Sequence, residues 1–287
     1  MHRFSLHDPP PPKEEHYRSI LSPREAQEDT FLSLLPHLPE PEPFSKRLGQ
    51  IREHVSAAKA AGRLVLVGEI GLDAAARVRV RPTHSTGDAG DWSASNLTPF
   101  KTSMAHQTTI ARAQLDLAVE LGVSVSVHCV AAPGATLDLL QAARKHAGAA
   151  AFSRINICIH SCGGMSPAFL KQAAKVLPNT YFSPSVSVTA RSPSAAESVR
   201  MIPRERILVE SDGPDVRDMT RLVWAATLWV AACRGWQVED EHTPEWELEE
   251  EEDEYDASGR IRSIPENEVW AVRTLERNWA RFMGLIM

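Results

Sequence analysis

The sequence predicts an α/β fold of the (β/α)8 TIM-barrel type that is incomplete on its N-terminal side. Short apolar runs alternate with segments of helical periodicity from about residue 64 onward, and this alternation is typical of a parallel sheet covered by helices. Four of the runs also lead into one Glu, His, His or Asp, at Glu69, His128, His160 and Asp212. Barrels of this kind carry their active sites at the carboxyl ends of the strands. These four residues are therefore the first candidates for a functional site.

Residues 1–45 are rich in proline and are expected to be irregular. Pro9 to Pro12 form a polyproline run, which favours an extended backbone. A short helix is predicted over 22–35, where Ser22-Pro23 supplies an N-cap and a first-turn proline. The rest of the chain, 46–287, is expected to form the barrel portion, and a longer helix is predicted over 43–61 with Gly62 at its end.

The first predicted strand covers 64–67 and leads into Glu69. Residues 74–103 follow without apolar periodicity, and they are expected to form a long loop insertion over the site. Helical spacing then predicts a helix over 103–121. The remaining pattern predicts strands at 123–127, 155–159, 180–188 and 206–209, and helices at 134–146, 167–177, 195–201, 216–234 and 265–283.

The strand count separates this chain from a complete barrel. The pattern gives about five strands, beginning near residues 64, 123, 155, 180 and 206, whereas a closed barrel of this type has eight. The Pro-rich region cannot supply three more. The expectation is therefore either an open sheet or a chain that lacks the first strands of the barrel.

Composition places the chain among ordinary globular proteins. It has 287 residues, of which 43% are hydrophobic and 24% charged. No uninterrupted apolar run approaches the roughly 20 residues of a membrane helix, so no membrane association is predicted, and the first eight residues lack a signal-peptide core. The four cysteines suit reduced thiols. A cytoplasmic or nuclear location is expected.

The charge is unevenly distributed. Residues 237–258 contain twelve Asp or Glu and no Lys or Arg, so removing their charge takes the net charge from -6 to +6. We predict an acidic insertion on a mildly basic body. A basic body suits a phosphate-bearing substrate, although this excess is also ordinary for a chain of this size, and an acidic run is usually a solvated segment.

The four candidate residues have the chemistry of a divalent-metal site. Histidine and carboxylate side chains bind the ions that activate water in phosphodiester hydrolases. Glu69 would bridge ions, and His128 and His160 would bind one ion. Asp212 would bind metal and accept the proton of the attacking water. Each residue alone has a plainer interpretation, such as a core histidine or a helix N-cap.

The motifs resemble those of the TatD-type metal-dependent deoxyribonucleases. The matching segments, which together span about residue 45 to the C-terminus, are Gly68–Asp73, His106-Gln107, Gln114–Ala118, Val127-His128, Ile159–Gly163 and Glu210–Pro214. The two insertions look most like the fungal branch, whose members are often labelled as partners of a tetratricopeptide subunit of the anaphase-promoting complex. The resemblance implies a metal-dependent hydrolase fold, DNA as substrate and a helical-repeat protein as partner.

The resemblance also implies roles for individual residues. Glu69 and Asp212 would be catalytic, and Glu69, His128, His160 and Asp212 would ligate a divalent ion, Mg²⁺, Mn²⁺ or Zn²⁺. Asp73 would support a ligand without binding metal itself. The family's first strand carries Asp-x-His-x-His, whose histidines bind a second ion, and this chain has no such motif. A complete two-metal site is therefore not expected.

Several alternatives stay open. A non-catalytic interaction scaffold that retains a degenerate barrel would explain the absent His pair, and similar barrels also act on small molecules. Cys158-x-His160-x-Cys162 could be read as a zinc site. His106 is expected to be solvated or to cap a helix, Asn278 to pack a helix, and Glu210 to pair with a neighbouring group.

Overall fold

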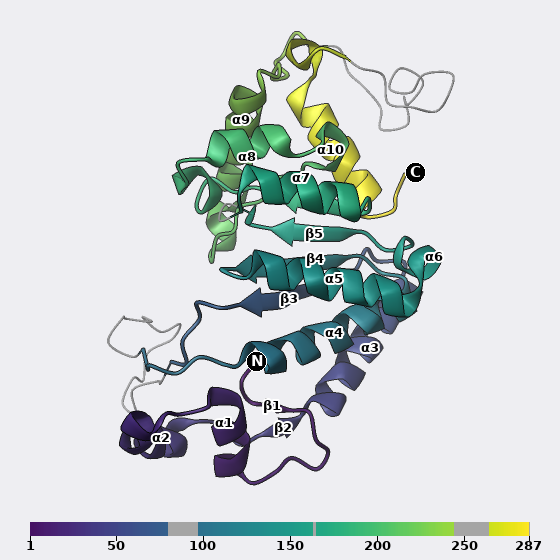
Figure 1. Cartoon of the computed structure of the whole chain (residues 1–287). Coiled ribbons are helices and arrows are strands. Elements are labelled where there is room, and N and C mark those ends of the chain that lie inside the picture. The colour runs from purple at the N-terminus through teal and green to yellow at the C-terminus, as the bar shows by residue number, and fades with distance from the viewer. Residues whose placement is uncertain (80–96, 163–164, 244–263, 287) are drawn as a thin grey trace.

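The structure is a computed structural model and describes residues 1–79, 97–162, 165–243 and 264–286. Its centre is a parallel sheet of β3 (Val67–Asp73), β4 (Val125–Val130), β5 (Ile157–His160) and β6 (Thr180–Ser183), in that spatial order. The strands point the same way in Figure 1. Their carboxyl ends therefore meet at one edge of the molecule, as the sequence predicted.

The sheet is open and smaller than expected. The fifth expected strand, 206–209, is held beside β6 by two isolated parallel bridges, Phe182↔Ile207 and Ser185↔Glu210. It forms no continuous strand, and a 3₁₀ turn (Arg204–Arg206) immediately precedes it. The first strand is also shifted. It begins at Val67, where the expected strand ended, and continues through the Gly68–Asp73 motif. The glycines of this motif interrupt the apolar run, so the run does not predict the strand.

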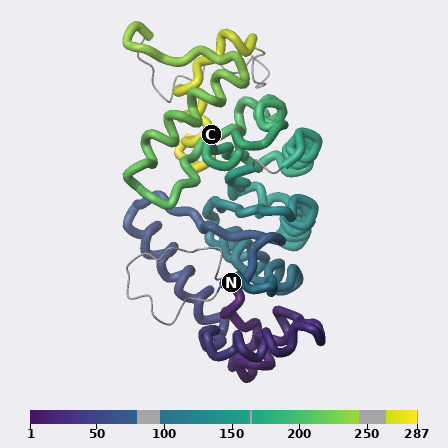
Figure 2. Tube along the Cα trace, turned by 90° about the vertical axis from the view of Figure 1, so that its left-hand side faces the viewer, coloured from purple at the N-terminus to yellow at the C-terminus, as the bar shows by residue number. Residues whose placement is uncertain are grey.

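Helices cover the sheet along its length. The larger ones are α3 (Phe44–Ala60), α4 (Met104–Leu121), α5 (Pro133–Ala147), α7 (Pro167–Val176), α9 (Met219–Arg234) and α10 (Ala271–Phe282). Two shorter helices, α6 (Ala149–Phe152) and α8 (Ala195–Met201), lie between them in the sequence. Seen along the strands in Figure 2, α5 and α7 lie on one side, and α3 and α9 on the other. The sheet thus has helices on both faces, the layer arrangement that alternating strands and helices produce.

The main core lies between the sheet and these helices. Val125, Val127, Ile157 and Ile159 are almost fully buried, and they belong to one cluster that extends from Val55 in α3 to Leu275 in α10. β5 is buried on both faces and β4 mainly on one, and buried strands of a parallel sheet are expected to be rich in Val and Ile. This burial explains why β4 and β5 were visible in the sequence.

The N-terminal region is more ordered than predicted. Residues 1–45 contain α1 (Lys13–Leu21), α2 (Glu28–Leu34) and a parallel pair of two-residue strands, β1 (Phe4–Ser5) and β2 (Glu42–Pro43). The prediction of an irregular segment is wrong here, because the proline run ends at the N-cap of α1, where proline does not oppose a helix. Buried Tyr17, Ile20 and Leu21, at helical spacing, were the missed signal.

Much of the two predicted insertions lies outside the described residues. Residues 80–96, which include His84, and residues 244–258 are not described. The described ends of the first insertion are joined by an antiparallel bridge between Arg79 and Leu97, and Gln237 pairs with Trp270 beside the second. Both insertions, and the boundary at residues 45 and 46, stay predictions. In the described parts of the chain, no helix is long and apolar enough to cross a bilayer.

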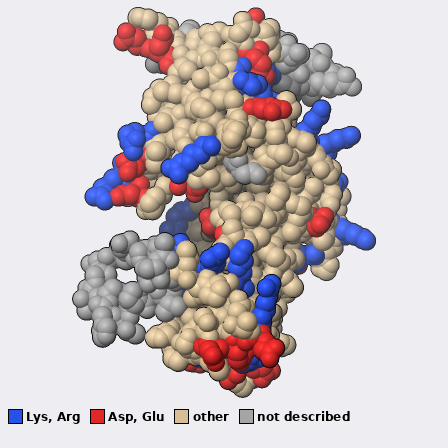
Figure 3. Space-filling view, turned by 60° about the vertical axis from the view of Figure 1, so that its left-hand side comes forward, with Lys and Arg blue, Asp and Glu red and all other residues tan. Residues whose placement is uncertain are grey.

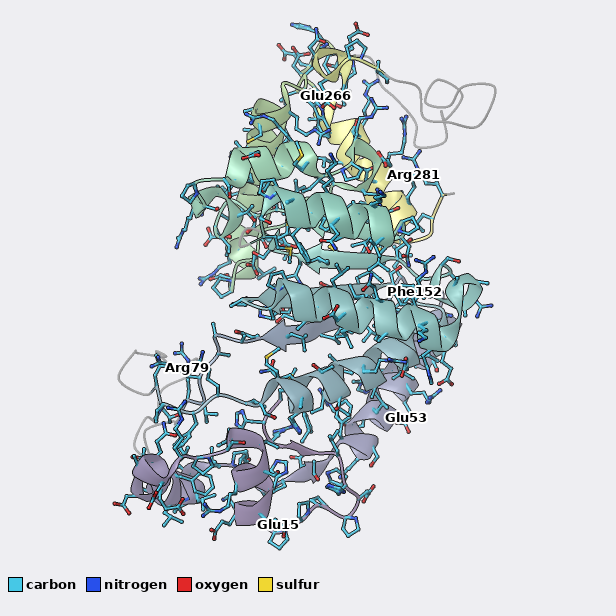
Figure 4. All side chains as sticks on the ribbon, in the orientation of Figure 1. Glu15, Glu53, Arg79, Phe152, Glu266 and Arg281 are labelled. Carbon is cyan, nitrogen blue, oxygen red and sulfur yellow. The ribbon has the colours of Figure 1, made fainter. Side chains whose placement is uncertain are left out.

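The end of α10 is attached to the edge of the sheet opposite the carboxyl ends. Ser124 Oγ donates to the Phe282 carbonyl at 2.9 Å, and Asn156 Nδ2 donates to the carbonyls of Arg281 and Phe282 at 2.9 and 3.1 Å. In Figure 4, Arg281 and Phe152 lie at this side, and Arg79 lies at the side to which the strands point. Asn278 Nδ2 donates to the carbonyls of Arg204 and Ile207, a packing role as expected.

Candidate metal centre

Glu69, His128 and His160 come together at the strand ends. His128 and His160 sit on neighbouring strands, β4 and β5. The register of β3 against β4 shifts between Val67 and Ile70, which leaves one extra residue on β3. Such a bulge re-aims the side chains on the bulged strand, and Glu69 is one of them. The three side chains therefore come from three adjacent strands, as the sequence predicted from their positions in the chain.

The distances within this group are short. Glu69 Oε2 lies 3.1 Å from His160 Nε2, and Glu69 Oε1 lies 3.5 Å from His128 Nδ1. The two imidazoles approach to 3.3 Å between His128 Nδ1 and His160 Nε2. Each residue thus directs one donor atom toward the same point, and these three atoms lie within 4.8 Å of one another.

The donor set fits a divalent transition-metal ion. Imidazole nitrogens suit Zn²⁺ and Fe²⁺, and a carboxylate oxygen also suits Mn²⁺. Among the described residues, this is the one group of His, Cys, Asp and Glu close enough to hold an ion. Cys158 and Cys162 are outside it. Because neither thiol lies close enough to the cluster to share an ion with it, the structure does not favour the zinc interpretation of these thiols.

His160 is the most buried member of the group, with 8% of its side chain exposed. Burial lowers its pKa and His128 acts in the same direction, while the carboxylates of Glu69 and Asp212 oppose them. A low pKa keeps the imidazole neutral. Only a neutral imidazole has the lone pair that a metal requires, so this environment suits a ligand.

Asp212 lies next to the group but is held by a different partner. Its Oδ2 accepts a 2.6 Å hydrogen bond from the Ser161 hydroxyl, and Ser161 directly follows His160. Both Ser161 and Asp212 have left-handed backbone angles, with φ of 45° and 42°. The structure places Asp212 at the rim of the site and not within the three-residue cluster, so its role as a ligand stays a prediction.

Glu210 pairs with neighbouring groups, as expected. Its Oε1 accepts the Ser161 backbone N–H at 2.6 Å. Burial raises the pKa of Glu210 to about 7, aided by the carboxylates of Asp212 and Glu69, while hydrogen bonds from Ser183 and Ser161 oppose the rise. Glu210 and Asp212 thus hold Ser161 from two directions, through its N–H and its hydroxyl.

Asp73 sits on the other side of His128. Its Oδ2 lies 3.6 Å from His128 Nε2, the nitrogen that faces away from Glu69. Its Oδ1 accepts the N–H groups of Ala75 and Ala76 at 2.8 Å, which fixes the carboxylate in a turn. Gln107 brackets the Asp73 backbone by donating to its carbonyl and accepting from its N–H. This position suits the supporting role proposed for Asp73.

A cavity of about 220 Å³ opens beside the group. Glu69, Asp73 and His128 line it together with Arg77 and the N-terminal His2. Figure 3 turns this edge of the sheet forward and shows a hollow there, with acidic and basic side chains around it. The cavity gives a ligand access to the cluster from solvent.

His106 does not join the site. It is buried in α4, where its ring packs edge-on against His16, with 6.2 Å between the centroids. The expectation of a solvated side chain is wrong, although its backbone N–H is capped by Ser103. Its neighbour His16 lies in α1, the helix that the sequence reading missed.

Sequence reasoning also missed the hydroxyl groups around the ligands. Ser126 Oγ lies 2.9 Å from His160 Nδ1, and Ser161 connects Asp212 with Ser185. Ser126 is two residues before His128 on β4, and residues two apart share a face of a strand. That spacing was the available signal for Ser126.

Comparison with known proteins adds a family match. Residues 22–243 match the model of the family described as TatD-related DNase. The chain is 27% identical over 250 residues to the Cut9-interacting protein scn1 of Schizosaccharomyces pombe, covering 79% of this chain and 71% of that protein. It is 26% identical over 205 residues to an uncharacterized deoxyribonuclease of Saccharomyces cerevisiae, covering 70% of this chain and 59% of that one.

A solved structure has a related fold. The crystal structure of YjjV, a TatD homologue from Escherichia coli, aligns with a TM-score of 0.51 over 82% of this chain and 69% of that chain. The two sequences are 15% identical, so the likeness concerns the fold alone. It confirms the predicted barrel-type α/β fold.

Proposed function

The chain belongs to the TatD-related DNase family, and we propose that it is a metal-dependent hydrolase that cleaves phosphodiester bonds in DNA. The observation that carries the proposal is the convergence of Glu69, His128 and His160 on one point within 4.8 Å. The relative named as a deoxyribonuclease supports the substrate class.

The residues divide the work between holding an ion and handling a proton. Glu69, His128 and His160 would hold a divalent ion, which when bound would supply Lewis acidity and activate water. Asp212 uses one carboxylate oxygen to accept from Ser161. The other oxygen would accept the proton of the attacking water. Arg77 lines the same cavity and would orient a phosphate by charge-assisted hydrogen bonds.

The first test is metal binding together with DNA cleavage. We expect Mn²⁺ or Zn²⁺ to raise the melting temperature of the wild type, because an ion that binds only the folded chain stabilises it. Glu69→Gln should remove this shift and the cleavage of DNA. Glu53→Gln, on the exposed face of α3, is the matched control and should behave as wild type. An unchanged metal response in Glu69→Gln would refute the site, and binding without cleavage would refute the nuclease activity.

A second candidate function is a non-catalytic interaction scaffold. It is favoured by the name of the relative scn1, which is called a Cut9-interacting protein, and the partner expected from the sequence is a helical-repeat protein. Affinity capture with wild type and Glu69→Gln separates the two functions. A partner retained equally by both proteins, in the absence of cleavage by either, supports the scaffold.

A further inference from the structure

Ser126 lies directly behind His160, on the side away from the ligand cluster. It belongs to β4, and its Oγ is 2.9 Å from His160 Nδ1. The opposite ring nitrogen, Nε2, faces Glu69 Oε2 at 3.1 Å and His128 Nδ1 at 3.3 Å. The two nitrogens of this imidazole therefore have different surroundings, with a hydroxyl on one side and the other ligands on the other.

Metal binding requires one form of this ring, and Ser126 is placed to stabilise it. A neutral imidazole carries one hydrogen, and the nitrogen that binds metal must be the one without it. If Nε2 is the ligand atom, the hydrogen sits on Nδ1 and points at Ser126 Oγ. A serine oxygen can accept that hydrogen bond. We propose that Ser126 is a positioning residue that fixes the tautomer and the ring orientation of His160 for metal binding; the inference rests on the proposed metal site.

The second histidine has an equivalent partner. His128 directs Nδ1 to the cluster, and its Nε2 faces Asp73 Oδ2 at 3.6 Å. Each imidazole thus has an oxygen on its far nitrogen, a hydroxyl for His160 and a carboxylate for His128. Partners of this kind commonly orient metal-binding histidines, and their loss typically costs about 10- to 100-fold in metal affinity.

The space around Ser126 restricts the residue that can do this. A Cβ added at Gly68 would lie only 2.9 Å from Ser126 Cβ, so β3 and β4 approach closely at this point. Gly68 leaves room for the Ser126 Cβ, and alanine would place its Cβ at the same point. The serine differs from alanine by its hydroxyl, which makes Ser126→Ala a clean test of that group.

The experiment compares Ser126→Ala with Ser124→Ala. The control removes a hydroxyl two residues earlier, one that donates to the Phe282 carbonyl far from the ligands. Zn²⁺ and Mn²⁺ affinities are measured by calorimetry. The hydrogen on His160 Nδ1 is followed by NMR in the Zn²⁺-loaded full-length protein. We expect it to exchange slowly with solvent in the wild type, because Ser126 Oγ accepts its hydrogen bond. We expect about 10- to 100-fold weaker metal binding and faster exchange of this hydrogen in Ser126→Ala, with both properties unchanged in Ser124→Ala.

The outcomes separate this inference from the proposed function. Equal metal affinity and unchanged exchange of the Nδ1 hydrogen in Ser126→Ala would overturn the positioning role while leaving the metal site intact. Absence of metal binding by the wild type would overturn the metal site and this inference with it.

Discussion

The surroundings of Glu210 change the pKa of its carboxyl group. It holds the backbone of Ser161 through one oxygen, and burial raises its pKa from 4.5 to about 7. Between these two values the folded chain keeps a proton that the unfolded chain releases. The contribution to stability is therefore complete below pH 4.5 and is lost as the pH rises through about 7.

Replacing Glu210 by Gln should remove this pH dependence, because Gln resembles the protonated acid. Relative to Glu210→Gln, the wild type should lose stability between pH 4.5 and 7 by at most about 3 kcal/mol, with no further change at higher pH. Urea unfolding of both proteins in chelator across this range measures the difference. Curves that stay parallel from pH 4.5 to 8 would show that Glu210 titrates normally.

Gly71 permits the closest approach of two strands at the site. Its φ is 144°, and a Cβ there would lie 2.0 Å from the carbonyl oxygen of His128, its partner in the β3–β4 ladder. We expect Gly71→Ala to destabilise the fold by about 3 kcal/mol or more, because strain and overpacking add.

Gly49 provides the control for that substitution. It lies within α3, and nothing stands within 4 Å of an added Cβ. Gly49→Ala should therefore stabilise the protein by about 1 kcal/mol, because alanine is the better helix former. Thermal unfolding followed by circular dichroism compares the two variants. A Gly71→Ala protein as stable as wild type would mean that β3 and β4 have room to separate.

At the scale of elements, Asn278 joins α10 to the segment that lies beside β6. It donates to the carbonyls of Arg204 and Ile207 at 2.7 and 2.9 Å, and its side chain is almost fully buried. Asn278→Ala should cost about 2–3 kcal/mol, because it leaves two carbonyl groups without this donor. Asn267→Ala, at an exposed position before the same helix, should change little. Chemical denaturation gives both values, and equal stabilities would refute the anchoring role.

The elements differ in how visible they are in the sequence. β5 is buried on both faces and β4 mainly on one, and their apolar runs predict where each strand begins to within two residues. β4 continues to Val130, three residues beyond its expected end. β3 carries the ligand motif and a bulge, and its strand character is hidden by Gly68, Glu69 and Gly71. The segment 206–209 has the apolar content of a strand, but whether it forms a full ladder depends on pairing with β6, which is a tertiary property.

Individual residues also differ in how well the sequence predicts them. The candidate ligands Glu69, His128 and His160 were predictable because each follows an apolar run and has an unusual side chain for that position. Ser126 and Ser161 act through hydrogen bonds to residues 34 and 51 positions away in the chain, and a serine in a strand has no distinctive pattern. Burial of His106 depends on α1, which the neighbouring prolines concealed.

At the scale of the whole molecule, the buried residues form separate clusters. The largest surrounds the sheet, and a second contains Tyr17, Phe31 and Leu34 from the N-terminal helices together with Val78 and Phe100. Regions with separate cores often open as separate cooperative units. The N-terminal helices should therefore open at a lower free energy than the strands of the sheet.

Phe31→Ala tests this division. Phe31 is fully buried in the second cluster, and its truncation should cost about 3–5 kcal/mol locally. Native-state hydrogen exchange should become faster in α1 and α2 and stay unchanged in β4 and β5. Ile157→Val, in the main cluster, should give the reverse pattern. Uniform acceleration in both variants would mean that the chain opens as one unit.

The attachment of α10 through Ser124 and Asn156 has an evolutionary consequence. It secures the C-terminal helix at the edge of the sheet opposite the cluster of Glu69, His128 and His160. Substitutions in that cluster should therefore leave this attachment in place. The architecture can then be inherited whether or not the proposed metal site is retained.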